Sequence, residues 1–136
     1  MTDVFTKEQR SAVMRRVRGK DTGPEMLVRR LLTALGYRYR LHRADLPGRP
    51  DIVFPGRRKA IFVHGCFWHG HDCRAGRNRP ASNASYWSVK LARTMARDER
   101  HGRELRQAGW TTLVLWECEI LKHLDEVREK LLRFLD

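Results

Sequence analysis

The stretch Ile61-Phe62-Val63-His64-Gly65-Cys66-Phe67-Trp68-His69-Gly70-His71-Asp72-Cys73 decides the fold of this chain and holds most of its chemistry. It opens as a β-branched and aromatic run, which predicts a buried strand, and the two glycines that follow allow tight turns. It contains three of the six histidines and two of the three cysteines. Core packing does not require so many metal-binding and proton-transferring groups, so the stretch predicts an active site joined to a metal site.

A second strand precedes this stretch. Residues 51–54 and 59–64 read as neighbouring strands joined by a turn at Pro55 and Gly56, and an antiparallel pair brings Asp51 close to His64. An acidic residue at the mouth of an apolar strand is costly unless it is solvated or binds a partner. A divalent cation is the favoured partner of Asp51, and a solvated loop end is the alternative.

The remaining sequence predicts further elements around these strands. Helices are expected over residues 6–17, 22–36, 85–107 and 119–135, and strands over residues 37–41 and 110–116. The strongly apolar segment 110–116 is of the kind buried in the middle of a sheet. A chain of 136 residues has room for one compact domain, so we expect one α/β domain spanning residues 1–136. Its residues 1–20 are expected to form a basic helix or arm, because Arg15, Arg16, Arg18 and Lys20 cluster there, and such an arm suits contact with DNA.

The composition favours a polyanionic partner. Lys and Arg number 28 against 16 Asp and Glu, a formal charge of +12, which indicates nucleic acid, although a merely basic soluble protein has the same signature. The N-terminus lacks an apolar signal region, and no apolar run reaches the ~18 residues of a membrane span. Three cysteines cannot all pair within one chain, and Cys66 and Cys73 lie beside His69 and His71, which favours thiolate metal ligands in a reducing compartment, so a cytosolic location is expected.

The cysteine spacing predicts a zinc site. Cys66, His71 and Cys73 supply three ligands, and Cys118 completes a Cys3His set if the strand before it ends beside the loop. Four protein ligands leave zinc no open position for water, so such a site is structural and holds the loop. The alternative is three unconnected cysteines with surface histidines.

Asp51, His64 and His69 remain outside the zinc set. A carboxylate and two imidazoles suffice for phosphodiester hydrolysis if Mg²⁺ holds the scissile phosphate and one imidazole takes a proton from water. Asp98 lies on the apolar stripe of the expected helix 85–107, where it either bonds the histidine-rich loop or is solvated at an edge. Glu25 is explained locally as the capping-box partner of Thr22.

Three motifs carry a family resemblance. The segments 46–51, 63–73 and 116–118 closely resemble the very-short-patch-repair (Vsr) DNA mismatch endonucleases, and the match covers nearly the whole chain. The resemblance implies a restriction-endonuclease-like fold, with a central mixed β-sheet flanked by helices and a structural zinc site. It also implies a strand-specific nick 5′ of the mispaired T in T:G mismatches that arise from 5-methylcytosine deamination, the first step of very short patch repair.

The same resemblance implies roles for single residues. Mg²⁺ is bound by Asp51 and by the main-chain carbonyl of Val63, where we would expect Thr in this family. His69 is the general base, His64 assists at the phosphate, Asp98 orients the catalytic histidine, and Glu25 is an active-site carboxylate. Zinc is held by Cys66, His71, Cys73 and Cys118. The residues implied to contact DNA are the aromatic wedges Phe67, Trp68 and Trp87, together with Met14, for which core packing is the local alternative.

Three classes of function stay open from the sequence. The first is a mismatch-nicking endonuclease acting on double-stranded DNA as a monomer in the bacterial cytosol or nucleoid, with mismatch-repair proteins as candidate partners. The second is a nuclease of the same fold with another target, such as a restriction enzyme. The third is a noncatalytic zinc-stabilised DNA-binding module, which would not need Asp51, His64 and His69 together.

Overall fold

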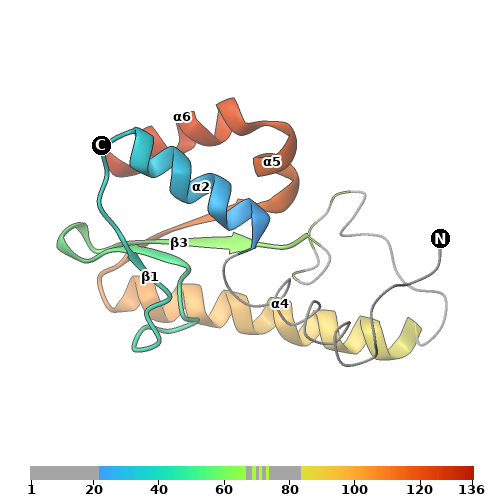
Figure 1. The fold of residues 1–136 in the computed structure, drawn as a ribbon. Coiled ribbons are helices and arrows are strands. Elements are labelled where there is room, and N and C mark those ends of the chain that lie inside the picture. Colours follow the sequence, from blue (N-terminus) through green and yellow to red (C-terminus); the bar gives the residue numbers. More distant parts are fainter. Residues whose placement is uncertain (1–21, 67–68, 70, 72, 74–83) are drawn as a thin grey trace, which may run out of the picture.

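The computed structural model describes residues 22–66, 69, 71, 73 and 84–136. A four-stranded sheet in the order β1-β2-β3-β4 carries helices on both faces (Figure 1). The strands are β1 (Arg40–Leu41), β2 (Ile52–Phe54), β3 (Lys59–His64) and β4 (Thr111–Trp116). The helices are α2 (Gly23–Ala34), α4 (Ala84–Gln107), α5 (Glu117–Lys122) and α6 (Leu124–Leu135), with a short 3-10 turn, η1 (Pro55–Arg57). The expected helix 6–17 and loop 74–83 lie outside the described residues.

The sheet is mixed, because β3 pairs antiparallel with β2 and parallel with β4. The predicted hairpin is confirmed: β2 and β3 are joined through η1, with Arg58 in the left-handed conformation. Strand β1 is shorter than the expected 37–41 and pairs with β2. The expectation that segment 110–116 lies in the middle of the sheet is wrong among the described strands, since β4 is at an edge. Its apolar sequence reflects helices covering both faces of the strand.

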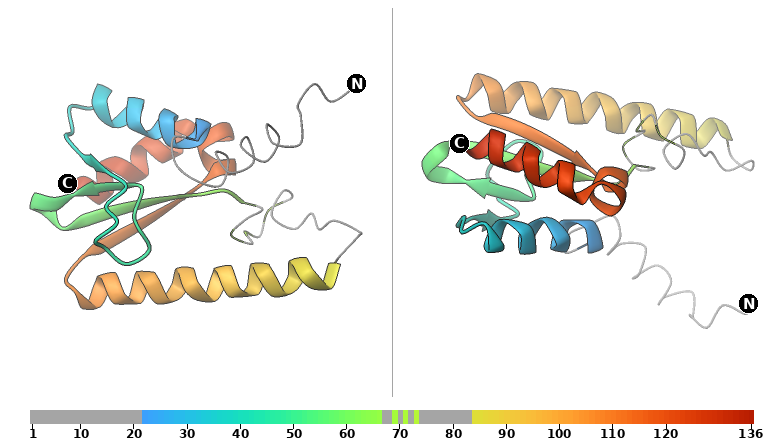
Figure 2. Two further views of the ribbon diagram at one scale, coloured as in Figure 1. Left: turned by 60° about the horizontal axis from the view of Figure 1, so that its bottom comes forward. Right: turned by 90° about the horizontal axis from the view of Figure 1, so that it is seen from above.

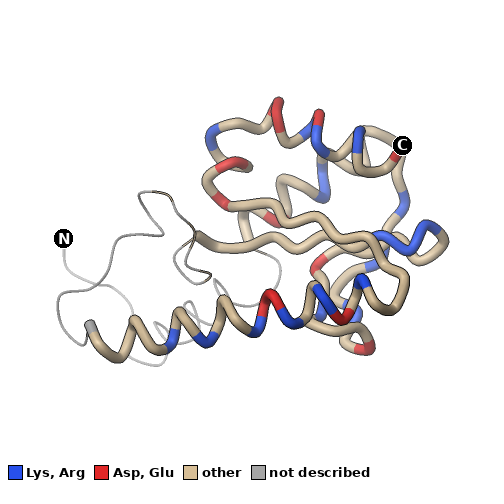
Figure 3. Tube along the Cα trace, turned by 180° about the vertical axis from the view of Figure 1, so that it is seen from behind, with Lys and Arg blue, Asp and Glu red and all other residues tan. Residues whose placement is uncertain are grey.

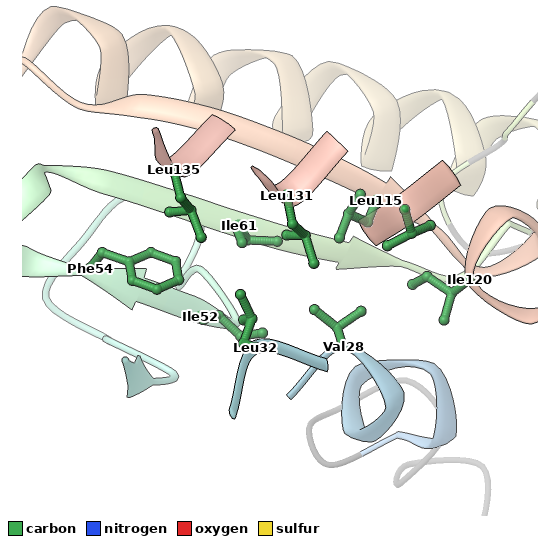
Figure 4. Close-up of a cluster of buried hydrophobic side chains, with 10 residues drawn as sticks. Val28, Leu32, Ile52, Phe54, Ile61, Leu115, Ile120, Leu131 and Leu135 are labelled. Carbon is green, nitrogen blue, oxygen red and sulfur yellow. The ribbon is translucent and has the colours of Figure 1, made fainter. Parts of the chain in front are cut away.

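Helices α2, α5 and α6 cover one face of the sheet and α4 covers the other (Figures 1 and 2). On the first face, side chains from α2 and α6 meet those of β2, β3 and β4 (Figure 4). The cluster is made of Val28, Leu32, Ile52, Phe54, Ile61, Leu115, Ile120, Val127, Leu131 and Leu135. This close-packed layer fixes the strands whose ends carry the candidate site.

Helix α2 starts as the sequence predicts. The backbone N–H of Glu25 donates to Thr22 Oγ1 at 3.3 Å, and proline occupies the first turn. The leucines at positions 27, 31, 32 and 35 predict one apolar face for this helix, but Val28 is fully buried with Leu32 while Leu27 is only partly buried. The helix is therefore rotated slightly from the orientation that the leucines alone suggest.

The other helices agree in type with the prediction and differ in detail. Helix α4 ends before Gly109, whose φ of +89° suits glycine. The predicted single helix 119–135 is instead two helices, α5 and α6, separated by His123 in a non-helical conformation. The break redirects the chain, so that Ile120 and Val127 both reach the core. Within the part of the chain that the structure describes, no helix has the length and apolar character needed to cross a membrane.

Candidate active site and metal centre

The candidate site lies where β3 and β4 end. The two strands run parallel with His64 opposite Trp116, so the residues that follow them emerge at the same edge of the sheet. Because side chains alternate along a strand, Val63 packs toward the α2 side while His64 points to the α4 side. The strand end therefore receives groups from both helical layers.

Asp51 is fixed at this edge by backbone contacts. Its own N–H donates to the carbonyl of Ile61 at 3.1 Å, and its Oδ2 accepts the N–H of Val63 at 2.7 Å. Burial raises the pKa of Asp51 to about 7, with the nearby Glu25 also raising it and the Val63 bond opposing the shift. A half-buried carboxyl with a raised pKa is a natural ligand for a cation, which would favour its ionised form.

Glu25 joins Asp51 from helix α2. Its side chain is only 1% exposed, and its Oε2 lies 2.9 Å from His42 Nε2 and bonds the Arg29 guanidinium as well. The predicted capping box is thus half formed: Thr22 accepts the Glu25 N–H, whereas the Glu25 carboxylate contacts Arg29 and His42. A donor atom from each of Glu25, His42 and Asp51 falls within 4.8 Å of the others.

Neither His42 nor Arg29 was assigned to the site from the sequence. Arg29 follows Glu25 by four residues on one helix face, so the helical period could have indicated that ion pair. His42 lies in the chain after β1, and no local pattern connects it with residue 25. The contact between them exists because the β1–β2 pair places His42 beside α2.

On the α4 side, His64, His69 and Asp98 form a second group. His69 Nδ1 lies 2.6 Å from Asp98 Oδ2, the bond that the inward position of Asp98 suggested. The rings of His64 and His69 stack at 3.8 Å with an interplanar angle of 4°. Because Asp98 engages Nδ1 of His69, that ring presents Nε2 for proton transfer.

The environment of His64 keeps its ring neutral. Burial, followed by the neighbouring His69, lowers the pKa of His64 to about 4. Its Nδ1 is buried with no hydrogen-bond partner among the described residues. A buried N–H without an acceptor is costlier than a buried lone pair, so the proton belongs on Nε2, where His64 can donate a hydrogen bond.

Asp98 carries the negative charge that its partner His69 requires when it is protonated. Burial alone would raise the pKa of Asp98, but the hydrogen bond and the charge of His69 outweigh it, so the pKa is lowered. Asp98 therefore stays ionised at neutral pH. An ionised carboxylate fixes the tautomer and orientation of the bonded imidazole.

The four predicted zinc ligands converge beside this group. One donor atom each from Cys66, His71, Cys73 and Cys118 lies within 4.8 Å of the others. Cys118 Sγ is 3.6 Å from His71 Nδ1, which matches the roughly 3.5 Å between sulfur and nitrogen ligands of a tetrahedral zinc ion. Burial raises the pKa of Cys66 to about 12, so this thiol ionises readily only when a metal holds it.

Trp116 links the two groups and was not assigned a role from the sequence. The ring of His71 stacks on it at 4.1 Å, and the ring of His64 meets it edge-on at 5.2 Å. Trp116 thus packs between a candidate zinc ligand and a candidate catalytic histidine. Of the predicted DNA-contacting residues, Trp87 is partly buried on α4 and its ring contacts Tyr86, while Met14, Phe67 and Trp68 lie outside the described residues.

Lys and Arg residues recur along α4 (Figure 3). An open groove of about 950 Å³ follows this helix, and its described lining includes Lys90, Arg93, Arg97 and Arg100. Arg97 is also close enough to Asp98 for its charge to help lower the pKa of that carboxyl. A row of cations beside a hydrolytic constellation suits a phosphate backbone.

Comparison with known proteins identifies similar chains. The family described as DNA mismatch endonuclease Vsr matches residues 2–75. A type II nicking enzyme of Xanthomonas oryzae pv. oryzae is 52% identical over 136 residues, covering 100% of this chain and 98% of the relative. The DNA mismatch endonuclease Vsr of Escherichia coli is 41% identical over 120 residues, covering 88% and 76% respectively. A type II nicking enzyme of Neisseria meningitidis is 42% identical over 135 residues, covering 99% and 95%.

Proposed function

Because this chain belongs to the Vsr family of DNA mismatch endonucleases, we propose that it hydrolyses one strand of duplex DNA on the 5′ side of the mispaired T in a T:G mismatch. Such mismatches arise when 5-methylcytosine is deaminated, and the nick would initiate very short patch repair. DNA cleavage by nicking follows from the family itself. The base pair, the cut position and the metal ion are the parts that we propose, together with a fold of the restriction-endonuclease type.

The observation that carries this proposal is the meeting of two groups at the end of β3. A carboxylate bonded to the Val63 N–H lies on one side, and the Asp98-bonded His69 stacks on His64 on the other. Phosphodiester hydrolysis needs a centre for the phosphate charge and a base for the attacking water. The Asp51 side would hold the cation that offsets the phosphate charge, and the His69 side would supply the base.

We assign the proton transfer to His69. Its Nε2 takes the proton from water while Asp98 holds Nδ1 and stabilises the imidazolium that forms. His64, neutral and protonated on Nε2, donates a hydrogen bond to a phosphate oxygen. A neutral His64 also suits the 3.8 Å stacking distance, because two stacked imidazolium rings would repel each other.

We propose that Mg²⁺ is held by Asp51 and the Val63 carbonyl, with Glu25 as a further carboxylate of the same centre. All of these donors are oxygen atoms, which is the chemistry that Mg²⁺ prefers. When bound, the ion would polarise the phosphate and offset the negative charge that develops on it. Its charge would also favour the ionised form of Asp51, whose pKa burial raises.

We propose a structural zinc ion for the set Cys66, His71, Cys73 and Cys118. A closed set of four ligands would tie the loop after β3 to the start of α5. His69 lies in that loop, within two residues of His71. The zinc ion would therefore hold the general base at the strand end without touching the substrate.

DNA recognition is assigned to two kinds of groups. Cations along the groove of α4 would contact phosphates, whereas Trp87, Phe67, Trp68 and Met14 would reach the base stack. Opening a base step costs a few kcal/mol and costs less at a mismatch, so wedging side chains favour mispaired sites. Mismatch-repair proteins are candidate partners of the protein.

The test is strand scission of an end-labelled duplex with one T:G pair, beside its matched T:A control, in several flanking sequences. We expect one nick beside the mispaired T that requires Mg²⁺ and is absent with excess chelator. Asp51→Asn should abolish the nick while retaining DNA binding, and Asp45→Asn, which changes an exposed carboxylate nearby, should not affect it.

Two outcomes would redirect the assignment. Cleavage of the matched duplex would indicate a restriction-type nuclease of the same fold. Binding without scission in every sequence context would indicate a noncatalytic zinc-stabilised module.

A further inference from the structure

Glu25 is a nearly inaccessible carboxylate held by two basic side chains from different parts of the fold. Arg29 is on the same helix, one turn along, whereas His42 comes from the sheet side. Both contact the same oxygen, Oε2, and both of these side chains are 12% exposed. Charge-assisted hydrogen bonds on one oxygen fix the rotation of the carboxylate, so its second oxygen has a set direction.

His42 also contacts the other carboxylate residue of this group. Its backbone N–H donates to the carbonyl of Asp51 at 3.1 Å, while its ring reaches Glu25. The backbone of His42 has a φ of +48°, a left-handed conformation that is unfavourable for a residue with a side chain. Such strained residues concentrate at functional sites, where the surrounding structure holds them in place.

The contacts of Arg29 and His42 with Glu25 offset the repulsion between the Glu25 and Asp51 carboxylates. Two carboxylates whose donor atoms lie within 4.8 Å repel each other, and Glu25 raises the pKa of Asp51. Arg29 offsets that charge but moves with α2. Among the described residues, His42 bonds both sides of this pair: its ring contacts the Glu25 carboxylate of α2, and its backbone N–H donates to the strand end that carries Asp51.

We propose that His42, assisted by Arg29, is a positioning residue that holds the Glu25 carboxylate beside Asp51, so that the two carboxylates bind one divalent cation. This inference rests on the proposed cation site at Asp51. His42 is not itself a ligand: its Nε2 donates to Glu25 Oε2 and leaves the second Glu25 oxygen to the ion. Without it, Glu25 would follow Arg29 and α2 alone, and the cation would lose its second carboxylate.

The test is binding of Mn²⁺, used as a probe for the divalent site, to the full-length zinc-loaded protein without DNA. Free Mn²⁺ is measured by electron paramagnetic resonance during a titration. His42→Ala should weaken binding by about 10-fold or more, the usual effect of losing a group that orients a metal ligand. His42→Gln, whose amide can still donate to Glu25, should restore most of the affinity.

The controls separate positioning from folding. Arg43→Met breaks an exposed ion pair with Asp45 in the same loop and should leave Mn²⁺ binding unchanged. Arg29→Met removes the second basic partner of Glu25, whose guanidinium also lies 3.5 Å from His42 Nε2, and should weaken binding while the His42 backbone bond to Asp51 is kept. Thermal melting of each variant identifies any loss that comes from unfolding.

Each outcome has a definite meaning. If Asp51→Asn loses Mn²⁺ binding and His42→Ala does not, the positioning role is refuted while the cation site stands. If neither substitution changes binding, the proposed cation site is refuted as well. Equal losses in His42→Gln and His42→Ala would refute a role through hydrogen bonding. Nitrogen coupling in the Mn²⁺ spin-echo spectrum that disappears in His42→Gln would make His42 a ligand and overturn the proposal.

Discussion

Replacing Asp98 with asparagine tests the proposed proton transfer most directly. Asp98 Oδ2 lies 2.6 Å from His69 Nδ1, and each side chain is 23% exposed, so the bond is partly shielded from water. Asparagine keeps the size of the side chain but removes its charge. It can also present an N–H to Nδ1, which would favour the tautomer with the proton on Nε2, where a base needs a lone pair.

The magnitude follows from the bond that is lost. A hydrogen bond to a charged group contributes about 1.5–3 kcal/mol. If that stabilisation is realised when His69 carries the proton, its loss slows the chemical step by roughly 10- to 160-fold. The assay is single-turnover nicking of the T:G duplex with enzyme in excess, because this rate excludes product release.

The matched control is Glu99→Gln, an exposed residue next to Asp98 on α4 with the same change of charge. It should nick at the wild-type rate, and Asp98→Asn should bind the duplex with wild-type affinity. A single-turnover rate for Asp98→Asn equal to that of the control would refute the assignment of His69 and Asp98. Equal slowing in both variants would attribute the effect to the surface charge of α4.

Three other substitutions probe the zinc ligands, the loop before Asp51 and Asp51 itself. Cys118→Ser should release the zinc measured by atomic absorption and lower the melting temperature, and full zinc retention would remove Cys118 from the site. Gly48→Ala should lower the free energy of unfolding in urea by about 1–3 kcal/mol, because φ is +76° and a Cβ would lie 2.8 Å from His101 Cβ. Gly56→Ala meets no atom within 4 Å and is its control, so an equal loss there would contradict the steric argument. Burial raises the pKa of Asp51 to about 7 from 3.8, so the native state holds a proton that the unfolded chain has released, and wild-type stability falls as pH rises through this window. Asp51→Asn cannot ionise, so its stability advantage in Mg²⁺-free buffer should grow from about pH 4 to about pH 7. A constant difference across that range would contradict the raised pKa.

Local patterns in the sequence were sufficient for the elements that the site is built on. The β2–β3 hairpin follows from two short apolar runs around Pro55 and Gly56, and the pairing brings Asp51 against Val63. The start of α2 follows from Thr22 and the proline in its first turn. These features depend on neighbours within a few residues, which a sequence displays directly.

The grouping of the four candidate zinc ligands was also predicted, although zinc itself stays a prediction. The spacing of Cys66, His71 and Cys73 places three ligands in one loop, and Cys118 was the one cysteine left. A tetrahedral zinc site needs a fourth ligand, so this requirement predicted a contact between residues 73 and 118 although they are far apart in the sequence. The parallel register that sets His64 opposite Trp116 brings Cys118 to that loop.

Two predictions were wrong because the apolar pattern of a segment was used to infer its place in the fold. A strongly apolar strand predicted the centre of the sheet, whereas β4 is at an edge of the described sheet with helices on both faces. Helical periodicity continues through residues 119–135, yet the helix is interrupted at His123, which has a non-helical conformation. Periodicity reports which side chains are buried, and it does not identify what buries them.

The family, the α/β class and the residues able to do the chemistry can be read from the sequence, because these depend on local patterns and on residue types. The contact of Glu25 with Arg29 and His42, in place of a complete capping box, depends on how the helices pack on the sheet. Only the tertiary structure decided that the ring of His64 lies flat against that of His69 and that Trp116 packs between the two groups. These contacts join residues from different layers of the fold, and their distances are set by the packing of helices against the sheet.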